Sequence, residues 1–100
     1  MRVSYSEDAV KDLVRLREFI EPKNPAAAKR AANAIRKGIS QLKEFPRLGV
    51  KVDSAYDPDL IRDLIMGNYL CRYLIMENVV YILRIWHHKE EVKILPMNTK

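Results

Sequence analysis

Residues 69–86 read YLCRYLIMENVVYILRIW, and this stretch decides the fold. The runs Tyr69–Met76 and Val79–Trp86 are rich in β-branched and aromatic side chains, which favour strands. Glu77 and Asn78 lie between the runs, and a two-residue connection containing asparagine is typical of a tight hairpin turn. The stretch therefore predicts an antiparallel β-hairpin.

A third apolar run, Leu60–Met66, precedes this hairpin and is joined to it by Gly67 and Asn68, a second pair of turn-forming residues. Three such runs with two short turns predict an antiparallel meander. Before them, residues 50–59 contain acids and turn formers without any hydrophobic period, and we expect a surface loop there.

The first half of the chain predicts a short strand and two helices. Arg2–Tyr5 alternates polar and apolar residues, as a strand does. Ser6 and the acids after it are typical of a helix start, and Pro22 ends that helix; Asn24 followed by Pro25 starts a second helix, expected over residues 25–44. The inward positions are expected to be Val10, Leu13, Val14, Leu16 and Ile20 in the first helix and Ala28, Ala31, Ala32, Ile35, Ile39 and Leu42 in the second.

These elements predict a single α+β domain over residues 1–100, with an N-terminal strand and an antiparallel helical hairpin packed on a small antiparallel sheet. A chain of 100 residues with 48% hydrophobic and 31% charged residues is globular. No apolar stretch approaches the roughly 20 residues of a membrane span, and the N-terminus has no apolar signal core, so we expect a cytoplasmic protein without a membrane partner.

The charge and the cysteine count limit the possible partners and cofactors. A net charge of +5 favours acidic or polyanionic partners such as RNA, DNA or a negatively charged protein segment. Cys71 is the one thiol, which excludes an intramolecular disulfide, and adjacent histidines on a strand point to opposite faces. We therefore expect no metal site and no cofactor.

The candidate functional residues are cationic or titratable groups on the meander and at its end: Arg62, Arg72, Arg84, His87, His88 and Lys89. A histidine acting as general acid or base, beside arginines that hold phosphate, would suit RNA cleavage. The alternative is structural: Arg62 and Arg72 would pair with acids such as Asp63, Glu18 or Glu77, and the histidines would carry no chemistry.

The relative position of the two central arginines depends on the strand register. A regular two-residue turn at Glu77 and Asn78 places Cys71 opposite Arg84, so that Arg72 and Arg84 face opposite sides of the sheet. A β-bulge would instead bring the two arginines together. Both arrangements stay open at this point.

The order of these elements and several short motifs resemble the toxins of the ParE/RelE superfamily. The motifs are Asn24-Pro25 followed by alanines, the segment 45–49 (FPRLG), the segment 62–65 (RDLI) leading into 67–73 (GNYLCRY), and the final 82–87 (ILRIWH). The resemblance covers nearly the whole chain and implies a RelE/ParE-like fold. It also implies the toxin of a type II toxin-antitoxin system, forming a hetero-oligomer with a cognate antitoxin that neutralises it.

Two activities are implied by this superfamily, and a third possibility is a non-toxic binding module. The helical hairpin and the ending at His87 look closer to the ParE, or plasmid stabilisation, branch, which inhibits DNA gyrase without chemistry of its own. The RelE branch cleaves messenger RNA on the ribosome. Leu70 stands where that branch carries an arginine, Arg72 is displaced by two positions, and no tyrosine follows Tyr81. His88 and Lys89 keep the endonuclease alternative open.

Overall fold

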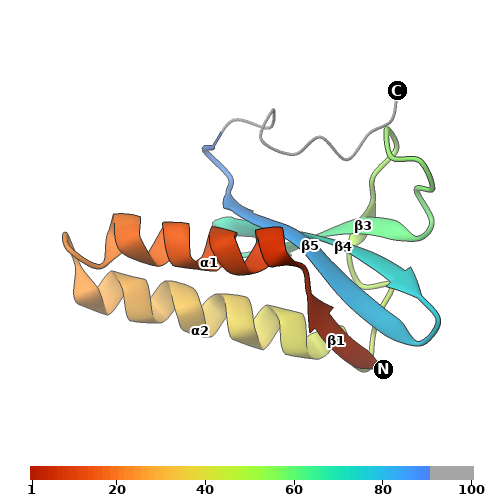
Figure 1. Cartoon of the computed structure of the whole chain (residues 1–100), viewed down its shortest axis with the longest axis horizontal. Coiled ribbons are helices and arrows are strands. Elements are labelled where there is room, and N and C mark those ends of the chain that lie inside the picture. Colours follow the sequence, from red (N-terminus) through yellow and green to blue (C-terminus); the bar gives the residue numbers. More distant parts are fainter. Residues whose placement is uncertain (91–100) are drawn as a thin grey trace.

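The computed structural model describes residues 1–90, which form a helical hairpin packed on one face of a five-stranded sheet (Figure 1). The elements in chain order are β1 (Arg2–Tyr5), α1 (Glu7–Ile20), α2 (Pro25–Gln41), β2 (Val50–Lys51), β3 (Ile61–Met66), β4 (Tyr69–Met76) and β5 (Val79–His87). This arrangement confirms the predicted α+β class, the N-terminal strand and the helical hairpin.

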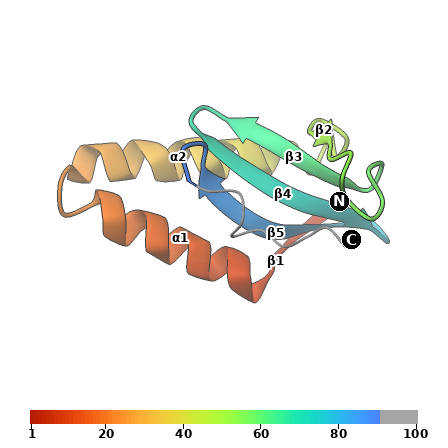
Figure 2. The ribbon, with the colours of Figure 1, turned by 90° about the horizontal axis from the view of Figure 1, so that it is seen from above.

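The strands follow the order β1-β5-β4-β3-β2, so the first strand of the chain lies beside the last one (Figure 2). β3, β4 and β5 form the predicted antiparallel meander. β1 pairs with β5 in parallel, from Arg2 opposite Val79 to Tyr5 opposite Ile82, which makes the sheet mixed. Both predicted turns are present, and Gly67, Glu77 and Asn78 adopt the positive φ that such turns require.

The helices begin where their capping residues predict. The Ser6 hydroxyl accepts a hydrogen bond from the Ala9 N–H, and the Asn24 side chain accepts one from the Ala27 N–H. α2 ends at Gln41, before the predicted residue 44, because the N–H groups of residues 42–44 bond to carbonyls three positions back.

The main core lies between the helices and the sheet. It includes Leu16, Ile35, Ile39 and Leu42 from the helical side and Cys71, Tyr73, Ile82 and Ile85 among the residues from the sheet. Val10 and Val14 of α1 were predicted inward but are about half exposed, and Ala32 of α2 is also exposed. The buried face of α1 is instead formed by Ala9, Asp12 and Leu16.

The segment from residue 50 to 59 is not wholly the surface loop that was predicted. Val50 and Lys51 pair with Asp63 and Arg62 as β2. Val52, together with Ala55 and Ile61, then forms a small second core. A two-residue strand carries too little hydrophobic pattern to be recognised from sequence.

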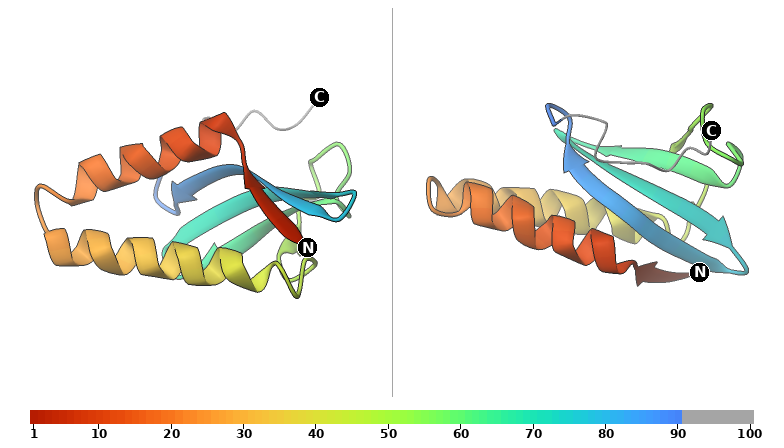
Figure 3. Two further views of the ribbon diagram at one scale, coloured as in Figure 1. Left: turned by 60° about the horizontal axis from the view of Figure 1, so that its bottom comes forward. Right: turned by 45° about the horizontal axis from the view of Figure 1, so that its top comes forward.

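The two helices run side by side, and their connecting turn projects beyond the ends of the strands (Figure 3). α1 lies along β5, and α2 lies along β3. Among residues 1–90, no helix is long and apolar enough to cross a membrane.

Candidate functional site

The end of β5 carries the two histidines. His87 lies opposite Tyr69 of β4, and the two rings meet edge to face with centroids 5.1 Å apart. His88 follows the last residue of β5, so strand alternation no longer separates the two imidazoles. Their rings stack with centroids 4.6 Å apart, and the expectation that they point to opposite faces is wrong.

Local hydrogen bonds fix the imidazole of His87. Its Nδ1 accepts a hydrogen bond from the Lys89 N–H at 3.1 Å, while its own backbone N–H donates to Glu90 Oε1 at 2.9 Å. Burial, and then the charges of His88 and Lys89, lower the pKa of His87, against the opposite effect of Glu90. A ring that accepts at Nδ1 and is disfavoured as a cation is neutral near pH 7.

Arg62 is held inside the protein by carbonyls and one carboxylate. Its Nε and Nη2 donate to the carbonyl and side chain of Asp59 at 2.9 and 3.1 Å, and its Nη1 donates to the carbonyls of Arg47 and Gly49. The side chain is only 9% exposed. Arg62 therefore fastens the segment after α2 to β3, and its acid partner is Asp59 rather than the acids named from the sequence.

Arg72 and Asp63 form a cross-strand ion pair between β4 and β3. Arg72 Nε and Nη2 donate to the two carboxylate oxygens at 2.8 and 2.9 Å, which is the bidentate geometry that guanidinium and carboxylate favour. The guanidinium also lies over the ring of Trp86, 5.6 Å from its centroid. The predicted Arg72–Asp63 pairing is confirmed.

A β-bulge decides the register between the central arginines. Tyr73 pairs with Ile82 but Arg72 pairs with Arg84, so β5 has one extra residue at Leu83. The Leu83 carbonyl accepts a hydrogen bond from the Ser6 hydroxyl at 2.9 Å. Of the two registers left open by the sequence, the bulged one is present.

Although they are neighbours in the register, Arg84 and Arg72 bind different carboxylates. Arg84 donates from Nε and Nη2 to the two oxygens of Asp12 in α1, at 2.8 and 3.0 Å. Asp12 also accepts from Arg15 at 3.1 Å and from the Ile85 N–H at 2.9 Å. Burial tends to raise the pKa of Asp12, but these hydrogen bonds outweigh it and hold the pKa below its usual value.

The structure thus brings together His87, His88 and Lys89 at the end of β5. Arg62 pairs with Tyr73 and lies on the side of the sheet that faces the helices. Arg72, next to Tyr73 in β4, lies on the opposite side. Among the described residues, no group of three or more histidine, cysteine, aspartate or glutamate side chains could hold a metal ion.

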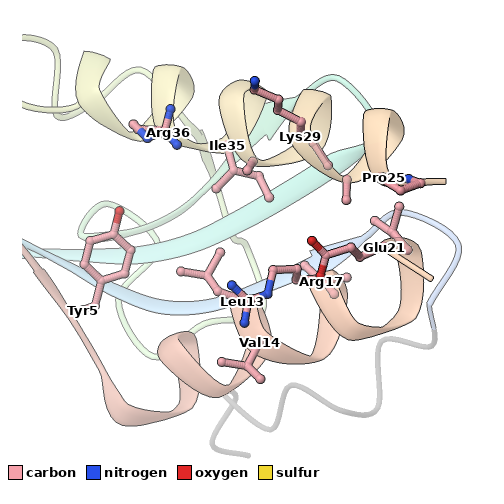
Figure 4. A pocket seen from close by; sticks show the side chains of 14 residues that line it. Tyr5, Leu13, Val14, Arg17, Glu21, Pro25, Lys29, Ile35 and Arg36 are labelled. Carbon is pink, nitrogen blue, oxygen red and sulfur yellow. The ribbon is translucent and has the colours of Figure 1, made fainter. Parts of the chain in front are cut away.

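A groove with a volume of about 580 Å³ lies between α1 and α2 and is a candidate binding site (Figure 4). Its walls are mostly apolar and come from both helices and from Tyr5 of β1: Leu13, Val14, Leu16, Ile20, Ala28, Ala31, Ala32 and Ile35. Arg17, Lys29 and Arg36 line the groove as cations, with Glu21 as the one acid among its lining residues. The groove can bind an apolar helix face that carries acids along its flanks.

The alanine-rich face of the second helix suggests an interaction surface from sequence alone, but core packing is the favoured interpretation of these alanines and of Val14, so the groove itself is not predicted. The available signal was Asp12, a carboxylate within the apolar stripe of α1 and one turn before Leu16. An acid in the apolar stripe indicates that the face of α1 with Ala9, Asp12 and Leu16 packs at the edge of the sheet. Val14, on another face of the helix, is then exposed to solvent.

The fold resembles a solved structure described as the chromosomal ParDE TA system from P. aeruginosa, with a TM-score of 0.71, 19% identity, and coverage of 87% of this chain and 95% of that one. The sequence is 29% identical over 86 residues to Toxin RelE2 of Caulobacter vibrioides. This alignment covers 86% of this chain and 93% of the relative.

The protein is a toxin of a type II toxin-antitoxin system, of the ParE/RelE superfamily. The family model described as ParE toxin of type II toxin-antitoxin system, parDE, matches residues 3–92, and the chain belongs to that family. Membership in such a system implies an antitoxin partner.

Proposed function

We propose that this toxin acts by binding DNA gyrase and not by cleaving messenger RNA. The observation that carries the proposal is the state of the three arginines. Arg62, Arg72 and Arg84 each donate to carboxylates or carbonyls within the protein, and a guanidinium used in this way is poorly available to RNA phosphate.

The geometry of the histidines supports the same choice. A general base needs a free nitrogen within reach of the substrate proton, yet His87 Nδ1 accepts from the Lys89 N–H. Glu90 is the acid beside it, but Glu90 binds the backbone N–H of His87 and the side chain of Arg15, not the imidazole. Both candidate targets are cytoplasmic, and we place the toxin there.

Two parallel assays of the purified chain test this proposal. With gyrase and supercoiled plasmid, we expect gyrase-dependent DNA cleavage; in a translating extract, we expect intact messenger RNA. His87→Ala should leave toxicity partly intact. Lys89→Glu should weaken the effect on gyrase in a salt-dependent way, while Lys11→Glu, an equal charge change on α1, should not.

The result that would reverse the choice is translation-dependent mRNA cleavage by the wild-type protein, with gyrase unaffected. Loss of that cleavage by a hundredfold or more in His87→Ala or His88→Ala would then identify a general acid or base.

We propose further that the groove between α1 and α2 binds a segment of the antitoxin. The support is its apolar lining with cations at the rim, which suits an amphipathic helix bearing acids. The antitoxin segment would order on binding and raise the melting temperature of the toxin.

A substitution that fills the groove tests directly whether the antitoxin binds there. Ala32→Trp places a large ring in the groove, whereas Ala34→Trp places the same ring at an exposed position of α2 outside it. With the product of the neighbouring antitoxin gene, calorimetry should give an affinity at least about tenfold weaker for Ala32→Trp, the loss expected at a central interface position. Equal affinities for the two variants would exclude the groove.

A further inference from the structure

Most of the net charge of the protein lies on one helix. Residues 24–43, which include all of α2, contain five lysines or arginines and no aspartate or glutamate, while the rest of the chain contains thirteen of each sign. The whole net charge of +5 therefore equals the charge of this segment.

The cations of α2 differ from those of the sheet in their surroundings. Arg62, Arg72 and Arg84 of the sheet bind carboxylates, whereas among residues 1–90 none of the α2 cations forms an ion pair. Within the described part of the chain, the only side-chain hydrogen bond from this set runs from Arg36 to the Asn33 amide oxygen, one turn away on the same helix. These charges are exposed and available to an external anion.

Helical spacing places the cations in two lines along the outer side of α2. Lys29 and Arg36, seven residues apart, form the line next to the groove, and Arg30 and Lys37 form a second line about 100° further round. Small polar side chains, Asn33 and Ser40, lie between the lines. From Lys29 to Lys37, this double line extends along about 12 Å of the helix.

The composition of this surface favours a nucleic acid over a protein. Protein interfaces have apolar or aromatic residues at their centre and are poor in lysine. Among the described residues of α2, no large hydrophobic side chain is exposed, and the outer face carries lysine, arginine, asparagine and serine, residues that contact phosphates, together with exposed alanines.

The geometry favours duplex DNA over RNA. Single strands are bound by stacking on exposed aromatic rings, and the outer face of α2 carries none. The major groove of B-DNA, about 12 Å wide, admits an α-helix whose two flanks can reach the phosphates of both strands, whereas the deep, narrow major groove of A-form RNA does not.

We infer that the outer face of α2, formed by Lys29, Arg30, Arg36 and Lys37, is a sequence-independent docking surface for the phosphate backbone of duplex DNA. The inference does not depend on which target the toxin has. The proposed DNA-binding surface lies beside the groove between α1 and α2. Arg30 and Lys37 belong to this surface and do not line the groove.

Salt dependence measures the number of phosphate contacts. Each neutralised phosphate contributes about −0.9 to the slope of log K against log salt, so four contacts give about −3.6 and an affinity loss of roughly 150-fold between 50 and 200 mM salt. The experiment is fluorescence anisotropy of the full chain, free of antitoxin, with a labelled 20-base-pair DNA duplex of arbitrary sequence.

Two double variants separate the α2 surface from net charge. Arg30→Gln/Lys37→Gln should reduce the slope by about 1.8 and weaken binding by roughly 60-fold at 100 mM salt. Lys11→Gln/Lys51→Gln removes the same charge from α1 and β2 and should leave the slope unchanged. Circular dichroism confirms that both variants fold, and exposed positions such as these tolerate substitution.

Three results would overturn the inference. Equal losses in the two double variants would mean a diffuse effect of net charge. Tighter binding of an RNA duplex or a single strand of the same length would exclude duplex DNA as the occupant. Binding of polyglutamate as tight as that of the duplex, at equal charge concentration, would indicate an acidic protein instead. None of these results bears on the gyrase assay, so the two proposals can fail separately.

Discussion

Replacing Asp12 with alanine should cost this protein a large part of its stability. The carboxylate is 4% exposed and accepts four hydrogen bonds, two from Arg84, one from Arg15 and one from the Ile85 N–H. Removing one partner of a buried ion pair costs about 3–5 kcal/mol because the other charge is left uncompensated. A domain of this length has roughly 5–15 kcal/mol in total.

Urea denaturation followed by circular dichroism measures this loss. With an m-value of roughly 1.5 kcal/mol per M, the midpoint for Asp12→Ala should fall by about 2–3 M. Glu18→Ala, an exposed acid on the same helix, is the matched control and should change the free energy of unfolding by less than about 0.5 kcal/mol. Arg84→Met should cost less than Asp12→Ala, because Asp12 keeps Arg15 and the Ile85 N–H.

The pH dependence gives an independent check on the same group. The pKa of Asp12 is lower in the folded protein than in the unfolded chain, so its stabilisation is fully present above the ordinary aspartate value of about 3.9. It is lost as the pH falls through the lower folded pKa. A loss below about 1 kcal/mol for Asp12→Ala, or an acid unfolding profile identical to that of the wild type, would refute this account of the α1–β5 contact.

Three further substitutions or conditions have defined outcomes. Tyr73→Phe removes the hydroxyl that donates to the Pro46 carbonyl at 2.7 Å and accepts from the Gly49 N–H at 2.8 Å, so the free energy of unfolding should fall by about 1–3 kcal/mol in a urea titration; an unchanged midpoint would contradict this. Gly49→Ala would place a methyl group 2.8 Å from the Asp63 carbonyl oxygen and the Tyr73 hydroxyl, and thermal melts should show destabilisation, whereas a raised melting temperature would show that the loop moves freely. The lowered pKa of His87 means that its contribution to stability is present above about pH 6.5 and declines as the pH falls through the folded pKa; the melting temperature of the wild type relative to His87→Gln should therefore drop between pH 7.5 and 5, and parallel curves would argue against it.

Local signals explain why most of the fold could be predicted from the sequence. Ser6 and Asn24 determine the helix starts through hydrogen bonds three residues away, and Gly67 and Asn78 determine the turns through their own φ angles. Such features depend on neighbours in the chain, which the sequence displays directly.

The parts that could not be predicted depend on contacts between distant residues. The bulge at Leu83 is accompanied by a hydrogen bond from Ser6, 77 positions away, and the partner of Arg84 is Asp12, 72 positions away. Nothing in the strand itself distinguishes the bulged register from the regular one. The groove could not be predicted for the same reason. The burial of Asp12 and the exposure of Val14 both depend on where α1 meets the edge of β5, which is a contact between distant parts of the chain.

The parallel pairing of β1 with β5 has a consequence for when the toxin can become active during synthesis. Arg2–Tyr5 are synthesised well before their hydrogen-bonding partner, Val79–Ile82, which follows more than 70 residues later in the chain. At roughly 5–20 residues per second, several seconds separate the two strands, and contacts of such high sequence separation also slow folding. A nascent or prematurely terminated chain that ends before residue 79 has neither the completed sheet nor the strand that α1 packs on, so the fold described above cannot form until translation passes that residue.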